Sequence, residues 1–305
     1  MNKFICGVLV LVLSLSFGFA YAQEQPVEAI GESSNAVKWS FPISPLEINS
    51  EYYLVISEDN LLSEDYEPQT LAKAPNSLRA TSADAFMDET ALLALTELIT
   101  AAKAVREYTY TSLDKKGEQV EDSISYEEEG MLLYIKSGYR KYGTQKTVYA
   151  NYLAKNDNVD NGAVEKPGAS EHQSGLCADV VNGDYASRST LTEDFQWTAE
   201  AQWLKENCAL YGFILRYPED KVNVTGHAFE PWHLRYVGVN AATYIMENEL
   251  TLNEFTDMFL SKYEKFIQDG GDVNSVTVKD LNMLPSSYIL DVHGDDGDND
   301  VSISF

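Results

Sequence analysis

Two short runs of residues, about sixty positions apart, constrain the fold of this chain more than any other feature. The first run contains His172 and Asp179, and the second contains Glu230 and His233. A catalytic zinc site takes three protein ligands from histidine, cysteine and carboxylate side chains and keeps one position open for water. A further carboxylate, not bound to the metal, can take a proton from that water. The runs therefore favour a fold that gathers both histidines and Asp179 around one ion, with Glu230 as the base.

The two runs also resemble the sequence patterns of a known enzyme family. The patterns S-x-H-x-x-G-x-A-x-D and E-x-W-H-x-R are those of the zinc D-alanyl-D-alanine carboxypeptidases of the VanY type, in the D-Ala-D-Ala peptidase superfamily. The resemblance extends to residues 137–140 with Gln145 and to residues 211–218, and it covers roughly residues 50–260. Because the chain has only four histidines, two at these positions favour a metal site over isolated polar side chains.

The resemblance implies a fold, a cofactor and an activity. The fold would be α+β and Hedgehog/D-Ala-D-Ala-peptidase-like, with a small antiparallel sheet flanked by helices and the zinc site at one end of the sheet. The cofactor would be one Zn²⁺ ion. The activity would be hydrolysis of the terminal D-alanine from peptidoglycan stem peptides that end in D-Ala-D-Ala. The residues by themselves indicate only an exported zinc hydrolase, and the substrate comes from the resemblance.

Further site residues come from the same resemblance. It gives Arg140 a part in binding the substrate or stabilising developing charge, since a guanidinium pairs bidentately with a carboxylate. A structural salt bridge is the alternative for Arg140. Ser137, Gln145 and Ser170 resemble pocket-lining positions of the family, and a local hydrogen bond is the equal alternative for each. Trp232 is expected either to form a wall of the pocket or to belong to the core.

Some polar residues near the two runs have structural interpretations instead. We expect Arg235 to brace the sheet and not to contact substrate. His227 has no matching partner pattern and is interpreted as structural. The tail that holds His293 contains a cluster of aspartates, whose spacing does not match a calcium-binding EF-hand loop. A solvated acidic tail is the favoured interpretation of that segment.

The first 22 residues have the features of a secretory signal peptide. Lys3 supplies the positive start, residues 5–19 are almost entirely apolar, and Ala20-Tyr21-Ala22 has the spacing of a cleavage site. The apolar run is shorter than the ~20 residues of a membrane span. We therefore expect an exported protein of the cell wall, periplasm or medium, without a stable membrane span after cleavage.

Charge and cysteine content limit the partners. With 22 Lys and Arg against 48 Asp and Glu, the net charge is −26, which disfavours binding to a nucleic-acid backbone. The expected partner is a peptidoglycan stem peptide, and the expected state is a monomer. Export permits a disulfide between Cys177 and Cys208, and two buried thiols are the alternative. Cys177 lies inside the first run but not at a ligand position of the family.

Composition divides the chain after the signal peptide pattern into three segments. Residues 23–48 read as a polar leader or linker, and residues 49–268 as the peptidase domain. Within that domain, 49–80 is expected to pack across the core as an extended segment, and 106–130 to be an acidic hairpin or loop insertion. Residues 269–305 are expected to form an acidic tail.

Hydrophobic spacing predicts the main elements. The expected helices span 82–105, 144–153 and 198–211, and two more begin at 240 and at 251, where Thr251 and Glu254 form a capping box. The expected strands span 131–135, 176–181, 213–217 and 235–237. Because side chains alternate along a strand, a bend at Ser174-Gly175 and another near Pro231 are needed to bring the ligands to one face.

Three alternatives remain open at this point. The same site could support an L,D-carboxypeptidase, a D,D-dipeptidase or an endopeptidase. The chain could also be a non-catalytic wall-binding protein on this fold, or a domain in which the metal is only structural. Glu230 argues against the last two alternatives, because neither has a chemical need for a base beside the metal.

Overall fold

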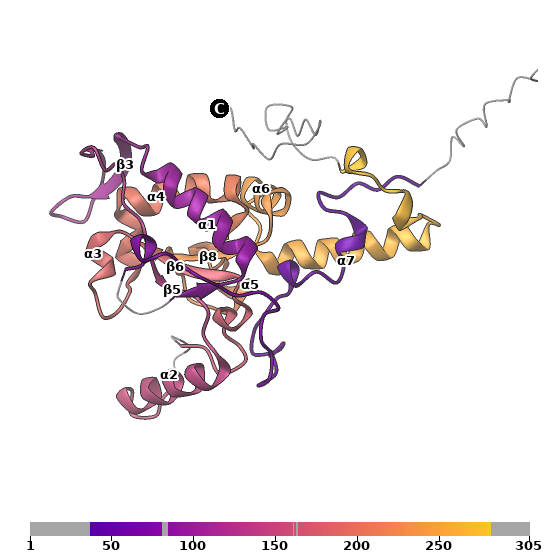
Figure 1. Ribbon diagram of the computed structural model, residues 1–305, viewed down its shortest axis with the longest axis horizontal. Coiled ribbons are helices and arrows are strands. Elements are labelled where there is room, and N and C mark those ends of the chain that lie inside the picture. Colours follow the sequence, from indigo (N-terminus) through magenta and orange to yellow (C-terminus); the bar gives the residue numbers. More distant parts are fainter. Residues whose placement is uncertain (1–36, 81–84, 161, 163, 282–305) are drawn as a thin grey trace, which may run out of the picture. The chain divides into compact units, whose positions relative to one another are not determined.

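The structure is a computed structural model, and it describes residues 37–80, 85–160, 162 and 164–281. These residues fall in one unit that begins at Val37. The signal peptide pattern and the acidic tail with His293 lie outside the described residues. The fold is α+β, with small antiparallel sheets and flanking helices, as expected from the resemblance (Figure 1).

Four short strands form the central sheet. They lie in the order β5-β6-β8-β7, and every neighbouring pair is antiparallel. The strands span Tyr134–Ser137 (β5), Cys177–Val181 (β6), Phe213–Leu215 (β7) and His233–Tyr236 (β8). The two sequence runs thus end in β6 and β8, which are adjacent at the centre of the sheet.

The register of β6 and β8 gives the central sheet two different faces. Asp179 lies opposite His233, and Cys177 lies opposite Arg235. Because residues two apart on a strand point to the same face, these polar side chains share one face. The residues between them on the strands, such as Ala178, are fully buried in the main hydrophobic cluster on the other face. The sheet therefore separates an apolar core from a polar site.

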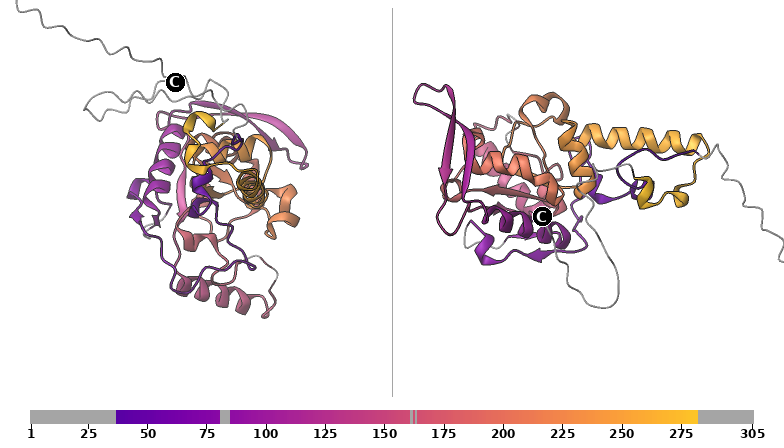
Figure 2. Two further views of the ribbon diagram at one scale, coloured as in Figure 1. Left: turned by 90° about the vertical axis from the view of Figure 1, so that its right-hand side faces the viewer. Right: turned by 90° about the horizontal axis from the view of Figure 1, so that it is seen from above.

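Helices α1 (Glu89–Ala102) and α4 (Ala199–Asn207) supply much of the core on the apolar face (Figures 1 and 2). In α1, Leu92, Leu95 and Ile99 are buried, as their spacing predicts. The helix begins at Glu89, later than expected, because the Asp88 side chain accepts hydrogen bonds from the first free backbone N–H groups and caps the helix.

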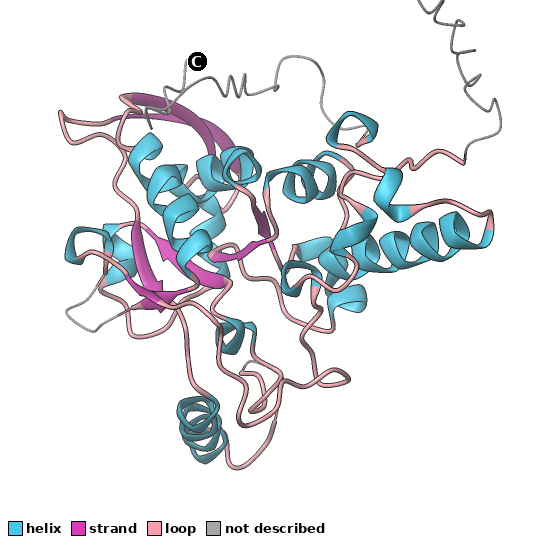
Figure 3. Cartoon of the chain, turned by 45° about the vertical axis from the view of Figure 1, so that its right-hand side comes forward, coloured by secondary structure: helices cyan, strands magenta, loops and turns pink. Residues whose placement is uncertain are grey.

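The remaining elements surround this core. The insertion is a hairpin of β3 and β4, which pair with each other in a sheet of their own (Figure 3). A second small sheet joins β1 to β2. The bounds are Ala72–Lys73 (β1), Phe86–Met87 (β2), Glu107–Leu113 (β3), Gln119–Ser125 (β4), Tyr142–Lys155 (α2), Gly183–Ala186 (α3), Val222–Thr225 (α5), Val239–Glu247 (α6) and Leu252–Gln268 (α7).

Several element ends differ from the sequence expectation by a few residues. β5 begins at Tyr134 because Met131 and Leu133, though buried, precede the paired segment. β8 begins at His233 and not at Arg235. The capping box of α7 is confirmed, since Thr251 accepts from the Glu254 N–H and Glu254 accepts from the Thr251 N–H.

Residues 37–48 form part of the folded unit, which differs from the polar leader expected for 23–48. Trp39, Phe41 and Ile43 are buried in a second hydrophobic cluster together with side chains of α6 and α7. The rings of Phe41 and Phe259 stack with their centroids 5.4 Å apart. Because the apolar residues alternate with other residues, one side of this short segment can pack against α7. The overall polar composition of residues 23–48 does not show this pattern.

No helix among the described residues is both long enough and apolar enough to cross a bilayer.

Replacing Phe41 tests whether residues 37–48 belong to the domain. Phe41 is 2% exposed, so Phe41→Ala should lower the free energy of unfolding by about 3–5 kcal/mol. Leu46→Ala is the matched control, because Leu46 in the same segment is 60% exposed and its loss should change stability by less than about 0.5 kcal/mol. Urea unfolding measures both, and equal small effects would show that the segment is a free leader.

Candidate metal centre and active site

A tight turn directs His172 toward the polar face of the sheet. Residues Glu171–Ser174 form one 3-10 turn, which ends at Gly175 with a φ of 73°. This left-handed conformation favours glycine. The Ser174 hydroxyl donates to the Glu171 carbonyl at 2.6 Å and accepts from the Leu176 N–H at 3.1 Å. The bend between His172 and Asp179 that the sequence required lies here.

A second turn carries Glu230 to the same face. The His233 N–H donates to the Glu230 carbonyl at 3.2 Å, so the chain turns across Pro231 before β8 starts. The carboxylate of Glu230 then lies beside the imidazole that follows it, with Oε2 3.5 Å from His233 Nδ1. Glu230 is partly exposed, so its carboxylate is accessible to solvent.

His172 and His233 each place one ring nitrogen beside the carboxylate of Asp179. His172 Nε2 lies 3.4 Å from Asp179 Oδ2, and His233 Nδ1 lies 3.3 Å from Asp179 Oδ1. Two ligand atoms about 2.1 Å from a tetrahedral zinc ion would be about 3.4 Å apart. Asp179 Oδ1 is buried and has no hydrogen-bond partner among the described residues. The donor set and its spacing therefore fit the ion that the sequence predicted.

The second nitrogen of each imidazole has a defined neighbour. His172 Nδ1 lies 2.7 Å from the Gly138 carbonyl oxygen, so Nδ1–H donates there and Nε2 keeps its lone pair for a metal. His233 Nε2 lies 3.5 Å from Glu171 Oε2, which leaves Nδ1 toward the site. Gly138 is close to the β2 backbone, since an added Cβ would lie 2.5 Å from the Phe86 oxygen.

Glu171 is at the centre of a buried ion cluster behind the site. Its Oε1 accepts from Arg216 Nε at 2.7 Å and from Arg235 Nη1 at 2.8 Å, and all three side chains are at most 1% exposed. Burial by itself would raise the pKa of Glu171, but the two guanidinium groups hold it well below its usual range. Glu171 is therefore a carboxylate that can accept from His233 Nε2–H.

Arg235 has the bracing role expected for it. Besides Glu171, its guanidinium donates through Nη2 to the carbonyl oxygens of Glu51, Tyr52 and Leu54 at 3.1–3.2 Å. These bonds tie the extended segment 49–80 to β8. Glu171 itself was missed by the sequence analysis, because a glutamate next to a motif histidine has no distinguishing spacing.

Arg140 is held in place by two of the predicted pocket residues. Its Nη1 donates to Gln145 Oε1 at 2.7 Å, and its Nη2 donates to Ser137 Oγ at 3.1 Å. The Arg140 N–H donates to the His172 carbonyl at 2.9 Å, which places this residue next to the metal ligands. Ser137 and Gln145 thus orient the guanidinium, which is half-buried.

The two other predicted pocket residues are more enclosed. Ser170 is 1% exposed, and its hydroxyl has no hydrogen-bond partner in the described part of the chain. Trp232 packs in the main hydrophobic cluster. Its side chain is 8% exposed, and the residue lies in the turn directly before β8.

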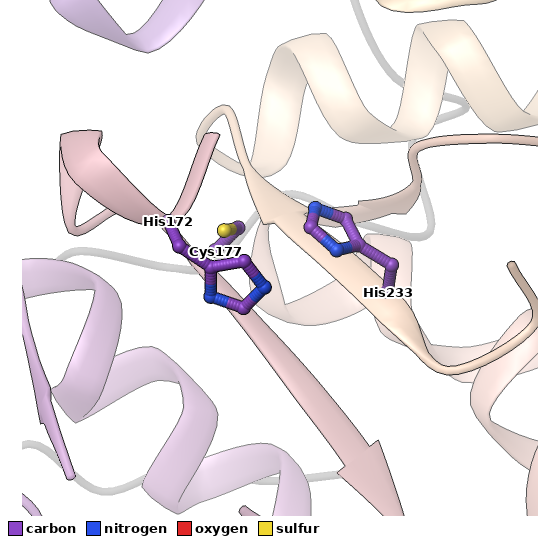
Figure 4. A group of neighbouring side chains, drawn as sticks. All are labelled: His172, Cys177 and His233. Atoms are coloured by element: carbon purple, nitrogen blue, oxygen red, sulfur yellow. The ribbon is translucent and has the colours of Figure 1, made fainter. Parts of the chain in front are cut away.

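The two cysteines are free thiols on opposite faces of the sheet, so the possible disulfide does not form. Cys208 belongs to the main hydrophobic cluster. Cys177 lies with the metal ligands instead (Figure 4). The family pattern has alanine two residues before its aspartate, so the chain departs from that pattern at Cys177.

His227 and Glu165 form a pair that the sequence analysis did not anticipate. His227 Nε2 lies 2.6 Å from Glu165 Oε1, and its ring stacks on Tyr217 with a centroid distance of 4.0 Å. The Glu165 carbonyl also accepts from Gln145 Nε2 at 2.6 Å. The pair connects the loop before the first run to the residues that hold Arg140. Their distance in sequence gives no local signal of this contact.

Electrostatics in the site suit a proton acceptor beside a metal. Burial raises the pKa of Glu230 to about 7, with Glu165 and Asp179 adding to the rise while His233 and His227 oppose it. Burial would lower the pKa of His172, but Cys177 and Asp179 outweigh burial and raise it to about 10. A metal ion needs the unprotonated nitrogen and therefore competes with protons for this site.

Comparisons with known proteins show which family this chain resembles. Residues 118–239 match the family model described as VanY: D-alanyl-D-alanine carboxypeptidase. YodJ of Bacillus subtilis (strain 168) is 45% identical over 131 residues, which are 42% of this chain and 46% of that protein. The bifunctional D-Ala-D-Ala dipeptidase and D-Ala-D-Ala carboxypeptidase VanXYC of Enterococcus gallinarum is 35% identical over 133 residues, which are 43% of this chain and 70% of that protein.

A solved structure shares the fold. It is that of the LdcB LD-carboxypeptidase, which was described as revealing the basis of peptidoglycan recognition. The two sequences are 32% identical, the TM-score is 0.54, and the match covers 67% of this chain and 84% of that chain. The chain spans less than half the length of the first curated relatives that it matches.

Replacing Glu171 tests whether its carboxylate orients the His233 imidazole for metal binding. In Glu171→Gln, metal affinity should fall about 10- to 100-fold, because a neutral amide orients the imidazole less strongly. Stability should also fall by about 3–5 kcal/mol, because two buried guanidinium groups lose their counter-charge. Glu200→Gln is the matched control, since Glu200 is also buried and hydrogen-bonded, to Tyr126 and Asn182.

Competition with a zinc indicator measures affinity, and unfolding measures stability. If both variants keep the affinity of the unmodified protein, Glu171 has no part in positioning the metal ligand.

Proposed function

We propose a function for this chain from the premise that it belongs to the VanY family of D-alanyl-D-alanine carboxypeptidases. The function is zinc-dependent removal of the terminal D-alanine from peptidoglycan stem peptides that end in D-Ala-D-Ala. The carrying observation is the site itself. The nitrogens of His172 and His233 lie 3.3–3.4 Å from the Asp179 oxygens, and Glu230 Oε2 lies 3.5 Å from His233 Nδ1.

The proposed mechanism divides the chemistry between four side chains of the chain. A zinc ion held by His172, Asp179 and His233 would supply a Lewis acid and would lower the pKa of a bound water toward ~7. Glu230 takes a proton from the attacking water at Oε2 and later delivers it to the leaving amine. Burial raises the pKa of Glu230 above its usual range, which favours a carboxylate that can also deliver a proton.

Arg140 supplies the recognition of the substrate's end. A carboxypeptidase must distinguish a free C-terminal carboxylate from an internal peptide bond. Ser137 and Gln145 fix two of the guanidinium nitrogens, and a guanidinium has further N–H groups in a planar fork. Arg140 is thus oriented in advance for a bidentate carboxylate contact.

A second candidate function is L,D-carboxypeptidase activity on the same site. The similarity to the LdcB LD-carboxypeptidase favours it, and the metal ligands and the base would have the same roles. The difference between the two functions lies in which peptide ends fit the pocket. We also propose that the protein is exported, on the basis of the signal peptide pattern in residues 1–22, and that it is a monomer.

Mass spectrometry of substrate peptides tests the proposal and separates the two functions. The purified protein with zinc should remove one alanine from a pentapeptide ending in D-Ala-D-Ala, and a chelator should abolish this. Loss of D-alanine from the tetrapeptide alone would assign the L,D activity instead. No cleavage of pentapeptide, tetrapeptide or cross-linked peptides by folded, zinc-loaded protein would sink the enzyme proposal in favour of a wall-binding protein.

Replacing Glu230 tests the base. Glu230→Gln should lower kcat by about 10²- to 10⁴-fold while zinc content stays unchanged, because the amide cannot accept the proton. Glu219→Gln is the control, since Glu219 is an exposed glutamate a few residues after the end of β7. A Glu230→Gln protein with full activity would assign the proton transfer to another group.

Replacing Arg140 tests carboxylate recognition. Arg140→Lys keeps the charge but loses the planar fork, so kcat/KM should fall about 10- to 100-fold, as expected for one charged hydrogen bond. A peptide with a C-terminal amide should show no such difference between the two proteins. Arg188→Lys, at an exposed arginine, should behave like the unmodified protein. Equal losses on both peptides would make Arg140 a structural residue.

A further inference from the structure

Cys177 is the position at which this chain departs from the family pattern, and it lies in the metal site. The pattern has alanine there, a side chain without a donor atom. In this chain the residue is a cysteine on β6, fully buried and two residues before Asp179. The two side chains therefore point to the same face of the sheet, toward His233 on β8.

The sulfur is within coordinating reach of both imidazoles. Cys177 Sγ and one nitrogen each of His172 and His233 all lie within 4.8 Å of one another, and all three residues are buried (Figure 4). Around a tetrahedral zinc ion, with Zn–S near 2.3 Å and Zn–N near 2.1 Å, sulfur and nitrogen ligands would be about 3.5 Å apart.

An independent observation shows that this volume is built for a ligand. Asp179 Oδ1, buried next to His233 Nδ1, has no hydrogen-bond partner among the described residues. A buried carboxylate oxygen without a partner is costly, and a cation at the centre of these residues would satisfy it. Cys177 thus faces a place where a metal ion is expected, and not a closed apolar pocket.

We propose that, without substrate, the Cys177 sulfur takes the fourth coordination position of this metal, in place of water. This rests on the proposed zinc centre. The thiol loses its proton to solvent, the metal–sulfur bond forms, and the coordinated water leaves. The ion then has four protein ligands, His172, Cys177, Asp179 and His233, a closed set typical of structural sites.

This closed state changes what the site does. Glu230 has no coordinated water to deprotonate until the sulfur leaves, so the resting protein does not hydrolyse peptide bonds. When substrate binds, the peptide carbonyl and a water together displace the sulfur, giving the five-coordinate arrangement that catalytic zinc sites can reach. A thiolate in the set also favours zinc over magnesium and manganese, which prefer oxygen ligands.

Cobalt substitution tests the proposal directly. Co²⁺ bound by histidine and carboxylate gives visible d–d bands, and a thiolate ligand adds a sulfur-to-cobalt charge-transfer band in the near ultraviolet. The purified protein loaded with Co²⁺ should show both kinds of band. Cys177→Ala, which restores the residue of the family pattern, should keep the d–d bands and lose the charge-transfer band. Cys208→Ala removes the other buried thiol and should retain both.

Each result has a separate meaning. A cobalt-loaded unmodified protein with d–d bands but no charge-transfer band overturns the sulfur ligand and leaves the proposed zinc centre intact. A charge-transfer band that persists in Cys177→Ala also overturns it, by assigning the sulfur to another residue. Failure of the unmodified protein to bind Co²⁺ at all overturns the metal centre and the sulfur ligand together.

Discussion

The buried carboxylate of Glu171, between Arg216 and Arg235, is the interaction on which the site depends. Moving three charges out of water costs several kcal/mol for each ion, and only close pairing and further hydrogen bonds offset that cost. The cluster supplies both: two contacts of 2.7–2.8 Å to Glu171 and three backbone carbonyls on Arg235. It joins the turn before β6, the end of β7, β8 and the extended segment 49–80. The second oxygen of the same carboxylate lies 3.5 Å from His233 Nε2.

Strand alternation and two turns then decide which side chains meet. β6 and β8 present Asp179 and His233 side by side on one face, while the apolar residues between them enter the core. The turns at Gly175 and at Pro231 carry His172 and Glu230 round to that face. The same alternation places Cys177 with the ligands. Cys177 thus shares the face of the proposed metal ligands, at a position where the family pattern has alanine.

Much of this arrangement could be predicted from the sequence, because it depends on local patterns. Residue type and spacing indicated the ligand set and the base, apolar periodicity indicated α1, and a capping box indicated the start of α7. The parts that were missed depend on contacts between distant segments. Glu171 meets Arg216 and Arg235 only after folding, and Glu165 meets His227 across two loops. Trp39, Phe41 and Ile43 alternate with other residues, but a pattern of three apolar positions is too short to distinguish a packed segment from a leader.

The most direct test of the central claim is an anomalous-scattering map from crystals of the purified zinc-loaded protein, measured at the zinc absorption edge. A single peak about 2.0–2.2 Å from His172 Nε2, His233 Nδ1 and an Asp179 oxygen is predicted. It would confirm that the turns, the sheet register and the Glu171 cluster together build one metal site. A peak that includes neither histidine, or no peak in a fully folded crystal, would contradict the account.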